Sequence, residues 1–408
     1  MKEYMKADKV TDNIYWVGAV DWAIRDFHGY TTERGTTYNA FLIMDEKITL
    51  IDTVKGPFRD EMFARIESIT PLDSIDYIIS NHAEMDHSGA LPETIERVKP
   101  EKVFASTMGG KALKAHFGKD FEIETVKTGD TLPIGKNTLT FVETRLLHWP
   151  DSMITYVDGA KALFTQDGFG MHLAGSNLFA DDYSEEILEW EARKYYANIL
   201  MPYSTKITAL LDSLPGLNLD IEYMLPDHGP MWKGEKNISW ILGLYRKWAE
   251  QPPARKAIVV YDTMWQSTEK MARAVAGGLS DAGITDIEVV HLGARDRSTL
   301  ATLVLSAGAL LVGSPTINNN IFPRVADSMT YLRGLRPNNL IGAAFGSYGW
   351  SGEAVKQLNE YLTATGVELV NEGFRVQYVP DEEALNKCHA MGLEVGKALL
   401  EKVNNWNS

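Results

Sequence analysis

The sequence has 408 residues, of which 45% are hydrophobic and 23% are charged, the composition of an ordinary globular protein. A chain of this length is expected to form two or more domains, each with its own core. The net charge of −15 argues against nucleic acid as a partner, and no apolar run approaches the roughly 18 residues of a membrane-spanning helix.

Two features of the sequence are typical of a cytoplasmic protein. The segment Met1–Lys6 lacks the apolar stretch of a signal peptide. Cys388 is the only cysteine, which excludes an internal disulfide and a four-cysteine iron site within this chain. We therefore expect a cytoplasmic protein that does not associate with a membrane.

A dense group of potential metal ligands follows the first clear buried strand, which the apolar run Ile75–Ile79 predicts. The next residues include two imidazoles and two carboxylates, on His82, Glu84, Asp86 and His87. Such groups are costly to hold at the edge of a core, and a bound cation would offset that cost. Hydrolases of the metallo-β-lactamase fold carry a similar H-x-H-x-D-H run that binds zinc. Here Glu84 replaces the second histidine, and its oxygen favours iron or manganese.

Three further ligands are predicted where strands pass into loops. His148 follows the alternating pattern of Leu139–Thr144. Asp167 ends the strand-like run Ala162–Asp167, and His228 follows a short apolar strand. A single residue of this kind is most often part of a turn. Together with the earlier run, these residues make four imidazoles and three carboxylates, enough for two metals and a bridging carboxylate.

The other histidines are expected to be structural. His116 ends a helix around residues 111–117, where a cation favours the helix dipole. His172, His291 and His389 have no carboxylate-rich surroundings in the sequence. His28 lies in an aromatic loop, and taken alone it is more simply explained as a packing residue.

A change in composition at Gln251–Ala254, which contains two prolines, indicates a linker between a domain at 1–250 and one at 254–408. Most of the negative charge lies before it. After it, five apolar runs alternate with helical patterns and predict a doubly wound parallel sheet. The predicted strands are Lys256–Asp262, Ile287–Leu292, Ala309–Gly313, Leu340–Phe345 and Phe374–Val379.

Three loops at the carboxyl ends of these strands are predicted to bind FMN, because ligands of such sheets lie at this edge. The first is rich in hydroxyl groups, which suits a phosphate, and it lacks the G-x-G-x-x-G of a dinucleotide site. Trp265, Tyr348 and Trp350 are expected to enclose a flat ring. Any one of these loops alone is better explained by helix capping and aromatic packing, and the prediction depends on all three lying at the same edge. The candidate residues are Thr263, Met264, Trp265, Gln266, Ser267, Thr268, Ser314, Pro315, Thr316, Ile317, Asn318, Asn319, Ser347, Tyr348, Gly349, Trp350, Ser351 and Gly352.

Taken together, the two halves resemble the flavodiiron proteins, also called A-type flavoproteins or rubredoxin:oxygen oxidoreductases. The resemblance implies a metallo-β-lactamase-like αββα sandwich followed by a flavodoxin-like domain. It implies one iron held by His82, Glu84 and His148. It implies a second iron held by Asp86, His87 and His228, with Asp167 bridging. Two further family residues near the irons match His28 and Tyr195, which are implied to act in catalysis.

The resemblance implies an oxidoreductase that reduces dioxygen to water, nitric oxide to nitrous oxide, or both. Two ferrous ions and one reduced flavin hold the four electrons that dioxygen needs. The electron donor is expected to be a separate rubredoxin, with a reduced deazaflavin coenzyme as the other family option. The family implies a head-to-tail homodimer, with a tetramer as the larger alternative. Two alternatives remain: a zinc hydrolase with an appended flavodoxin, and a non-catalytic flavin electron carrier.

Overall fold

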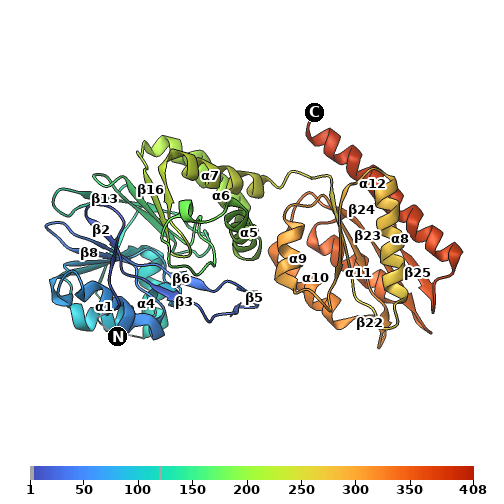
Figure 1. Cartoon of the computed structure of the whole chain (residues 1–408), viewed down its shortest axis with the longest axis horizontal. Helices are drawn as coiled ribbons and strands as arrows, with labels where there is room; N and C mark the ends of the chain where they lie inside the picture. Colours follow the sequence, from blue (N-terminus) through green and yellow to red (C-terminus); the bar gives the residue numbers. More distant parts are fainter. Residues whose placement is uncertain (1–3, 119–121) are drawn as a thin grey trace. The chain divides into compact units, whose positions relative to one another are not determined.

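The computed structural model describes residues 4–118 and 122–408, which form two compact units (Figure 1). The first unit comprises residues up to 28, 32–195 and 203–246, and the second comprises 29–31, 196–202 and 247–408. The main division falls inside helix α7 (Gly234–Glu250), shortly before the proline-containing segment. Among the described residues, no helix is long and apolar enough to cross a membrane.

The first unit contains two large sheets. The seven-stranded sheet has the order β1-β2-β7-β8-β9-β10-β11, and the six-stranded sheet runs from β12 to β17 in chain order. The strands of the first sheet are Asp8–Lys9, Ile14–Trp16, Phe41–Ile43, Thr49–Ile51, Tyr77–Ser80, Lys102–Ser106 and Ile123–Val126. Those of the second are Thr131–Pro133, Thr138–Glu143, Met153–Val157, Ala162–Gln166, Tyr223–Pro226 and Trp232–Lys233. The shorter strands β3 to β6 are Ala19–Asp21, Asp26–Phe27, Tyr30–Thr31 and Thr36–Tyr38.

Alternation of side chains along the strands of the first sheet divides its residues between two cores. Phe41, Ile51 and Ile79 pack with Phe141 and Phe164 of the second sheet. Their chain neighbours Leu42, Leu50 and Ile78 lie in the other core, where the sheet meets helices α1, α3 and α4. Because successive strand residues point to opposite faces, a strand of continuous apolar residues feeds both layers. The predicted sandwich is confirmed.

The helices of the first unit follow the same layering. Helices α1, α3 and α4 span Arg59–Glu67, Leu91–Val98 and Thr107–Phe117. The short helix α2 is Met85–Ser88, within the predicted ligand run. Helices α5 (Glu185–Tyr195), α6 (Ser204–Ser213) and α7 lie together beside β16 in Figure 1. Tyr196–Leu200 continues α5 as a π-helical turn.

The second unit is a doubly wound domain around a parallel sheet of order β19-β18-β20-β23-β24. The strands β18, β19, β20, β23, β24 and β25 are Lys256–Tyr261, Asp286–His291, Ala309–Gly313, Ile341–Tyr348, Glu368–Leu369 and Phe374–Gln377. The helices α8 to α12 are Ser267–Asp281, Arg297–Val304, Pro323–Leu335, Ala354–Thr365 and Glu382–Trp406. Strands β24 and β25 both pair with β23, so the predicted fifth strand is preceded by a short piece that the sequence does not reveal. The flavodoxin-like fold is confirmed.

One core of this domain lies between the sheet and helices α8 and α12. It contains Val259 and Leu311 from the strands, Val275 from α8, and Cys388 and Val395 from α12. Burial of Cys388 in this core raises the pKa of its thiol to about 12. The thiol therefore stays protonated, and Cys388 acts as a packing residue rather than as a reactive one.

Candidate functional site

A hydrogen-bonded clamp on Asn81 shapes the loop that carries the first ligand candidates. Strand β9 ends at Ser80, and Asp52 accepts hydrogen bonds from both the backbone and the side-chain amide of Asn81, each at 2.7 Å. Thr155 donates to the Asn81 side-chain oxygen at 2.7 Å. These contacts fix the chain direction immediately before His82, so that the following residues turn into helix α2.

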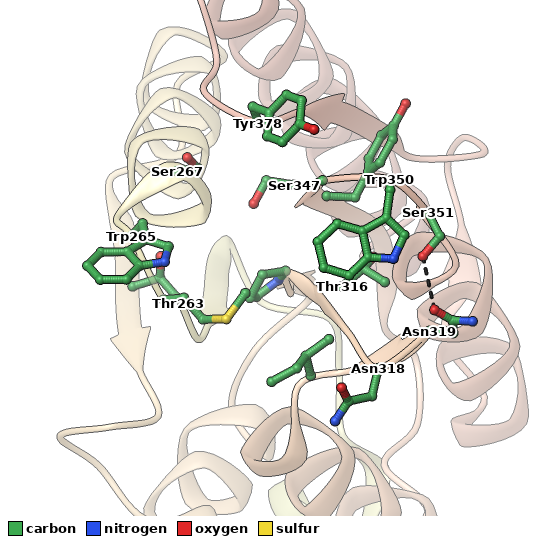
Figure 2. A pocket seen from close by; sticks show the side chains of 15 residues that line it. Thr263, Trp265, Ser267, Thr316, Asn318, Asn319, Ser347, Trp350, Ser351 and Tyr378 are labelled. Carbon is green, nitrogen blue, oxygen red and sulfur yellow. Dashed lines mark hydrogen bonds between the residues drawn. The ribbon is translucent and has the colours of Figure 1, made fainter.

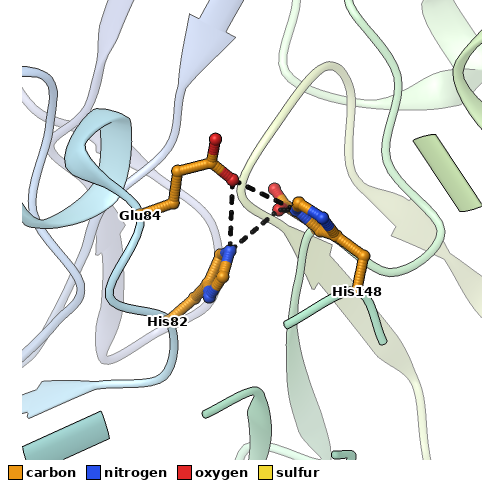
Figure 3. A group of neighbouring side chains, drawn as sticks. His82, Glu84 and His148 are labelled. Carbon is orange, nitrogen blue, oxygen red and sulfur yellow. Dashed lines mark hydrogen bonds and ion pairs between the residues drawn. The ribbon is translucent and has the colours of Figure 1, made fainter. Parts of the chain in front are cut away.

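Four candidate ligands from three segments of the chain surround one point (Figure 3). Glu84 Oε2 lies 3.4 Å from His82 Nε2 and 3.2 Å from His148 Nε2. Asp167 Oδ2 lies 3.4 Å from His82 Nε2 and 2.8 Å from His148 Nε2. Two nitrogen and two oxygen atoms therefore face one another within metal-binding range.

A second group lies directly beside the first. His87 Nε2 lies 3.3 Å from Asp86 Oδ1, and His228 Nε2 lies 3.2 Å from Asp86 Oδ2. The other oxygen of Asp167, Oδ1, is 3.0 Å from His87 Nε2 and 3.4 Å from His228 Nε2. Asp167 therefore presents one carboxylate oxygen to each group, the arrangement expected of a carboxylate that bridges two metal ions.

Several buried atoms of the two groups lack hydrogen-bond partners among the described residues. They are His82 Nε2, His87 Nε2, both oxygens of Asp86, and Asp167 Oδ1. Unpaired polar atoms are costly in a protein interior, and a cluster of them that faces one point is unusual for a structural network. Their chemistry fits a pair of divalent cations, with nitrogen and carboxylate oxygen as ligands.

Side chains behind the histidines orient the candidate ligand rings. His82 Nδ1 lies 3.0 Å from Asp151 Oδ2, which also accepts the Ala83 backbone amide at 2.7 Å. His87 Nδ1 is 3.4 Å from Asp227 Oδ2, and His228 Nδ1 is 2.6 Å from the Thr37 carbonyl oxygen. Such partners direct the opposite ring nitrogen toward a metal.

The sequence reasoning did not single out Asp151 or Asp227. Their positions gave a weak indication of a role at the site, because Asp227 directly precedes His228 and Asp151 lies three residues after His148.

The electrostatics of the groups favour positive charge between the carboxylates. Burial lowers the pKa of His82, but its contacts with Asp151 and Glu84 outweigh burial and raise it to about 10. Burial raises the pKa of Asp167, but the charge of His87 and the contact with His148 hold it well below its usual range. Two divalent cations would supply the charge that protons on the imidazoles otherwise provide.

His28 and Tyr195 both lie next to the candidate ligands. His28 Nε2 is 3.4 Å from Glu84 Oε1, and the His28 side chain is 75% exposed, so it stands at the solvent side of the first group. Tyr195 is buried at the end of α5, with its ring centroid 6.0 Å from that of His228.

His172, which was expected to be structural, lies next to the candidate ligands. Its ring centroid lies 4.7 Å from that of His228 and 5.0 Å from that of Tyr195. Its Nδ1 is 2.8 Å from Thr36 Oγ1. Only the fold brings these residues together, because His172 has apolar neighbours in the sequence. His116 stacks on Trp149, while His291 and His389 pair with Asp262 and Asp281 in the second unit.

The predicted flavin loops line a cavity of about 410 Å³ in the second unit (Figure 2). The indoles of Trp265 and Trp350 are 88% and 86% exposed, and Figure 2 shows them on opposite sides of the cavity. Ser351 donates to the Asn319 side chain at 3.2 Å, which connects two of the loops. The cavity offers aromatic surface together with hydroxyl and amide groups, as a flavin mononucleotide requires.

Four of the predicted residues do not line the cavity: Gln266, Thr268, Ser314 and Gly352. Thr268 is buried, and its hydroxyl lies 3.2 Å from that of Ser347, so it supports the cavity wall. The hydroxyl of Ser314 accepts the Phe322 backbone amide at 2.9 Å.

Tyr378, which the sequence did not single out, lines the cavity. Its backbone has a φ of 58°, and its amide donates to the Tyr348 carbonyl at 2.6 Å, so its place depends on a local turn.

Comparisons with known proteins match both units. A family model described as ODP family beta lactamase matches residues 36–229, and a flavodoxin model matches residues 259–392. The chain is 43% identical over 401 residues to the rubredoxin-oxygen oxidoreductase of Megalodesulfovibrio gigas, across 98% of this chain and 100% of that protein. It is 46% identical over 396 residues to the nitric oxide reductase of Moorella thermoacetica, across 96% and 98%. The crystal structure of the flavodiiron protein from Giardia intestinalis matches with a TM-score of 0.94 and 33% identity, over 99% of each chain.

Proposed function

The chain belongs to the flavodiiron proteins, and we propose that it reduces dioxygen to water, nitric oxide to nitrous oxide, or both. The observation that carries this proposal is the position of Asp167 between two ligand groups, with one oxygen facing each. The relatives with names that state an activity include a rubredoxin-oxygen oxidoreductase and a nitric oxide reductase. A flavodoxin domain in the same chain supplies the second cofactor, FMN.

In this proposal the two ligand groups hold two iron ions. His82, Glu84 and His148 hold one, Asp86, His87 and His228 hold the other, and Asp167 bridges them. When bound, the irons and the flavin together store four electrons, the number that converts one dioxygen to two waters; two suffice to convert two nitric oxide molecules to nitrous oxide. The protein orients the ligands, limits access of water through burial, and places donor groups beside the substrate.

His28 and Tyr195 are proposed to be those donor groups. The exposed imidazole of His28 lies beside Glu84, and the buried phenol of Tyr195 lies beside the ring of His228. Burial raises the pKa of Tyr195 well above its ordinary value, which keeps its hydroxyl protonated and able to donate. Neither residue is needed to hold a metal, so both are expected to act on substrate rather than on metal content.

The FMN is proposed to bind at the cavity formed by the three loops of the second unit. The first loop leads into the N-terminus of helix α8, where backbone amides and the helix dipole favour a phosphate. The hydroxyl of Thr263 in this loop is buried without a hydrogen-bond partner among the described residues, as expected of a donor reserved for a ligand. Trp265 and Trp350 are proposed to cover the flavin ring.

Metal and flavin analysis of the natively purified protein tests the cofactor assignment. We expect close to two irons and one FMN per chain, because two ligand groups adjoin at Asp167 and the predicted flavin loops of the second unit line a cavity. Both the iron content and the flavin content are measured against protein concentration. Stoichiometric zinc in place of iron would instead favour a hydrolase of the metallo-β-lactamase fold.

The electron donor is proposed to be a separate rubredoxin, and the name of one relative supports this choice. A reduced deazaflavin coenzyme is the competing donor in the family. Anaerobic mixing of the oxidised protein with each reduced donor separates the two, because only the physiological donor should reduce the flavin within a catalytic cycle. We also propose a cytoplasmic location, because a sequence with one cysteine forms no disulfide of its own, as is usual for cytoplasmic proteins.

The working unit is proposed to be a head-to-tail homodimer, with a tetramer as a possible higher assembly. Here the flavin of one chain serves the irons of the other, in closed two-fold symmetry. A mixed dimer tests this arrangement. One chain carries His82→Asn with Asp167→Asn, and the other is prepared without FMN. In a hybrid dimer, the FMN of the chain without metal then lies beside the irons of the chain without FMN. We expect gas reduction to reappear in the mixture through this one pair of cofactors. If the hybrid dimers form and stay inactive, electrons pass within a chain and the proposal is wrong.

A further inference from the structure

The indole ring of Trp149 lies against the first ligand group and has no part in the proposed reaction. It meets the ring of His82 at an angle of 87°, with centroids 5.2 Å apart, and its centroid lies 6.0 Å from that of His148. The exposed imidazole of His116 stacks on the indole, with centroids 5.9 Å apart and an angle of 11° between the planes. Trp149 therefore lies between two candidate ligands of one metal and a surface residue.

The ligand group that Trp149 contacts is the more open of the two. The side chains of Glu84 and His148 in the first group are each 13% exposed. The side chains of the second group, Asp86, His87 and His228, are at most 4% exposed. A small molecule that arrives from solvent therefore meets the first group before the second.

The proposed reaction lacks two electrons whenever the flavin cannot supply them. Dioxygen needs four electrons and four protons to give two waters, and two irons hold only two of those electrons. Indole and phenol rings are among the most easily oxidised side chains of a protein. The phenols of Tyr38 and Tyr195 have ring centroids 6.0 Å from that of His228, in the more enclosed group. Trp149 is the indole in contact with the open group, which makes it the favoured source of the missing electrons.

We propose that Trp149 is an oxidation site, which supplies two electrons and is hydroxylated when dioxygen meets the reduced irons without a reduced flavin. The inference rests on the proposed function, because it concerns the same irons and the same gas. The indole loses two electrons to dioxygen, and water adds to a ring carbon. A carbon–oxygen bond forms, a carbon–hydrogen bond breaks, and two protons are released. In sum, one dioxygen, two electrons from the irons, two protons and one indole give one hydroxylated indole and one water.

The surroundings of Trp149 suit this reaction. The ring contacts with His82 and His148 give a short path for electrons toward the metal that these residues would hold. Trp149 is half-buried and His116 is exposed, so water reaches the indole from the surface. The reaction removes dioxygen without releasing hydrogen peroxide, and it uses up one side chain.

The test is peptide mass spectrometry of the reduced, iron-loaded, full-length protein after one reaction with a limiting amount of dioxygen. The reaction is run with and without FMN, in water enriched in heavy oxygen, with catalase present to destroy hydrogen peroxide that diffuses away. Trp265 and Trp350 are 88% and 86% exposed and serve as internal controls. An oxidant in solution would modify these two residues before the half-buried Trp149. Iron content is measured for every sample.

Without FMN, we expect one heavy oxygen atom on Trp149 for each dioxygen consumed, with Trp265 and Trp350 unmodified. With reduced FMN, Trp149 should stay intact, because the flavin supplies the two electrons. Trp149→Phe keeps an aromatic ring that is harder to oxidise, so this variant without FMN and without catalase should release hydrogen peroxide. Trp190→Phe makes the same change at another half-buried indole, on α5, and should leave the modification of Trp149 unchanged.

An intact Trp149 in FMN-free protein that has consumed dioxygen would overturn the inference, whether the product is hydrogen peroxide or a modified Tyr38 or Tyr195. An added oxygen atom without the heavy label would contradict the step in which water adds to the ring. If protein that holds two irons consumes no dioxygen with or without FMN, the proposed function itself has failed. That result is distinct from consumption of dioxygen that leaves Trp149 unmodified.

Discussion

The Asp167→Asn variant is expected to keep its FMN and to lose gas reduction by more than about a hundredfold. Asp167 faces both ligand groups, with Oδ2 2.8 Å from His148 Nε2 and Oδ1 3.0 Å from His87 Nε2. An amide removes the negative charge and replaces one of the two oxygens with a donor group, so one metal loses its contact with residue 167 and the other keeps only a neutral oxygen. Mutation of a residue that only hydrogen-bonds to a metal ligand typically lowers metal affinity or activity by about 10–100-fold. Mutation of a ligand that two metals share should lower activity by more. Iron content, flavin content and the rate of gas reduction measure the effect.

A matched control for Asp167→Asn is Asp60→Asn, on the exposed face of α1. It makes the same chemical change far from both ligand groups and should leave iron content and gas reduction unchanged. An Asp167→Asn protein with two irons and the natural rate would contradict the bridging role of Asp167.

Removal of FMN is expected to convert the protein from a catalyst into a reagent that reacts once. Without the flavin, the reduced diiron centre holds two of the four electrons that dioxygen requires, and the route from the donor is interrupted. We expect one fast reaction with the gas followed by no further turnover, and recovery of turnover when FMN is added back. Continuous gas consumption by the flavin-free protein, with donor present, would show that electrons bypass the second unit.

The sequence predicts the fold well because both units have strong, regular patterns. The β-branched run Lys256–Asp262 and the four later apolar runs mark a parallel sheet that is buried on both faces. The short strand β24 was not predictable, because Glu368–Leu369 contains too few residues to establish a pattern. Segments 29–31 and 196–202 belong to the second unit through packing, for example the 3.2 Å bond from Asn198 Nδ2 to the Ser298 carbonyl. Contacts across about a hundred residues leave no local signal.

The candidate site also contains residues that the sequence predicts and residues that it does not. The seven predicted ligands each follow a strand or lie in one dense run, so their types and positions are visible in the sequence, and the structure places them in two adjoining groups. His172 was not recognisable as a neighbour of the candidate ligands. It contacts Thr36 and the ring of His228, which are distant from it in the chain. These surroundings exist only after folding.

The most direct test of the proposed function is product analysis after one reaction of the fully reduced protein with dioxygen. The reduced protein, loaded with two irons and one FMN per chain, is mixed with a limiting amount of dioxygen, and the oxidised cofactors and any hydrogen peroxide are counted. The proposal predicts four electrons removed from the cofactors for each dioxygen consumed, with water as the product. Hydrogen peroxide in an amount equal to the dioxygen consumed, with only two electrons removed, would contradict it and indicate a simple flavin oxidase.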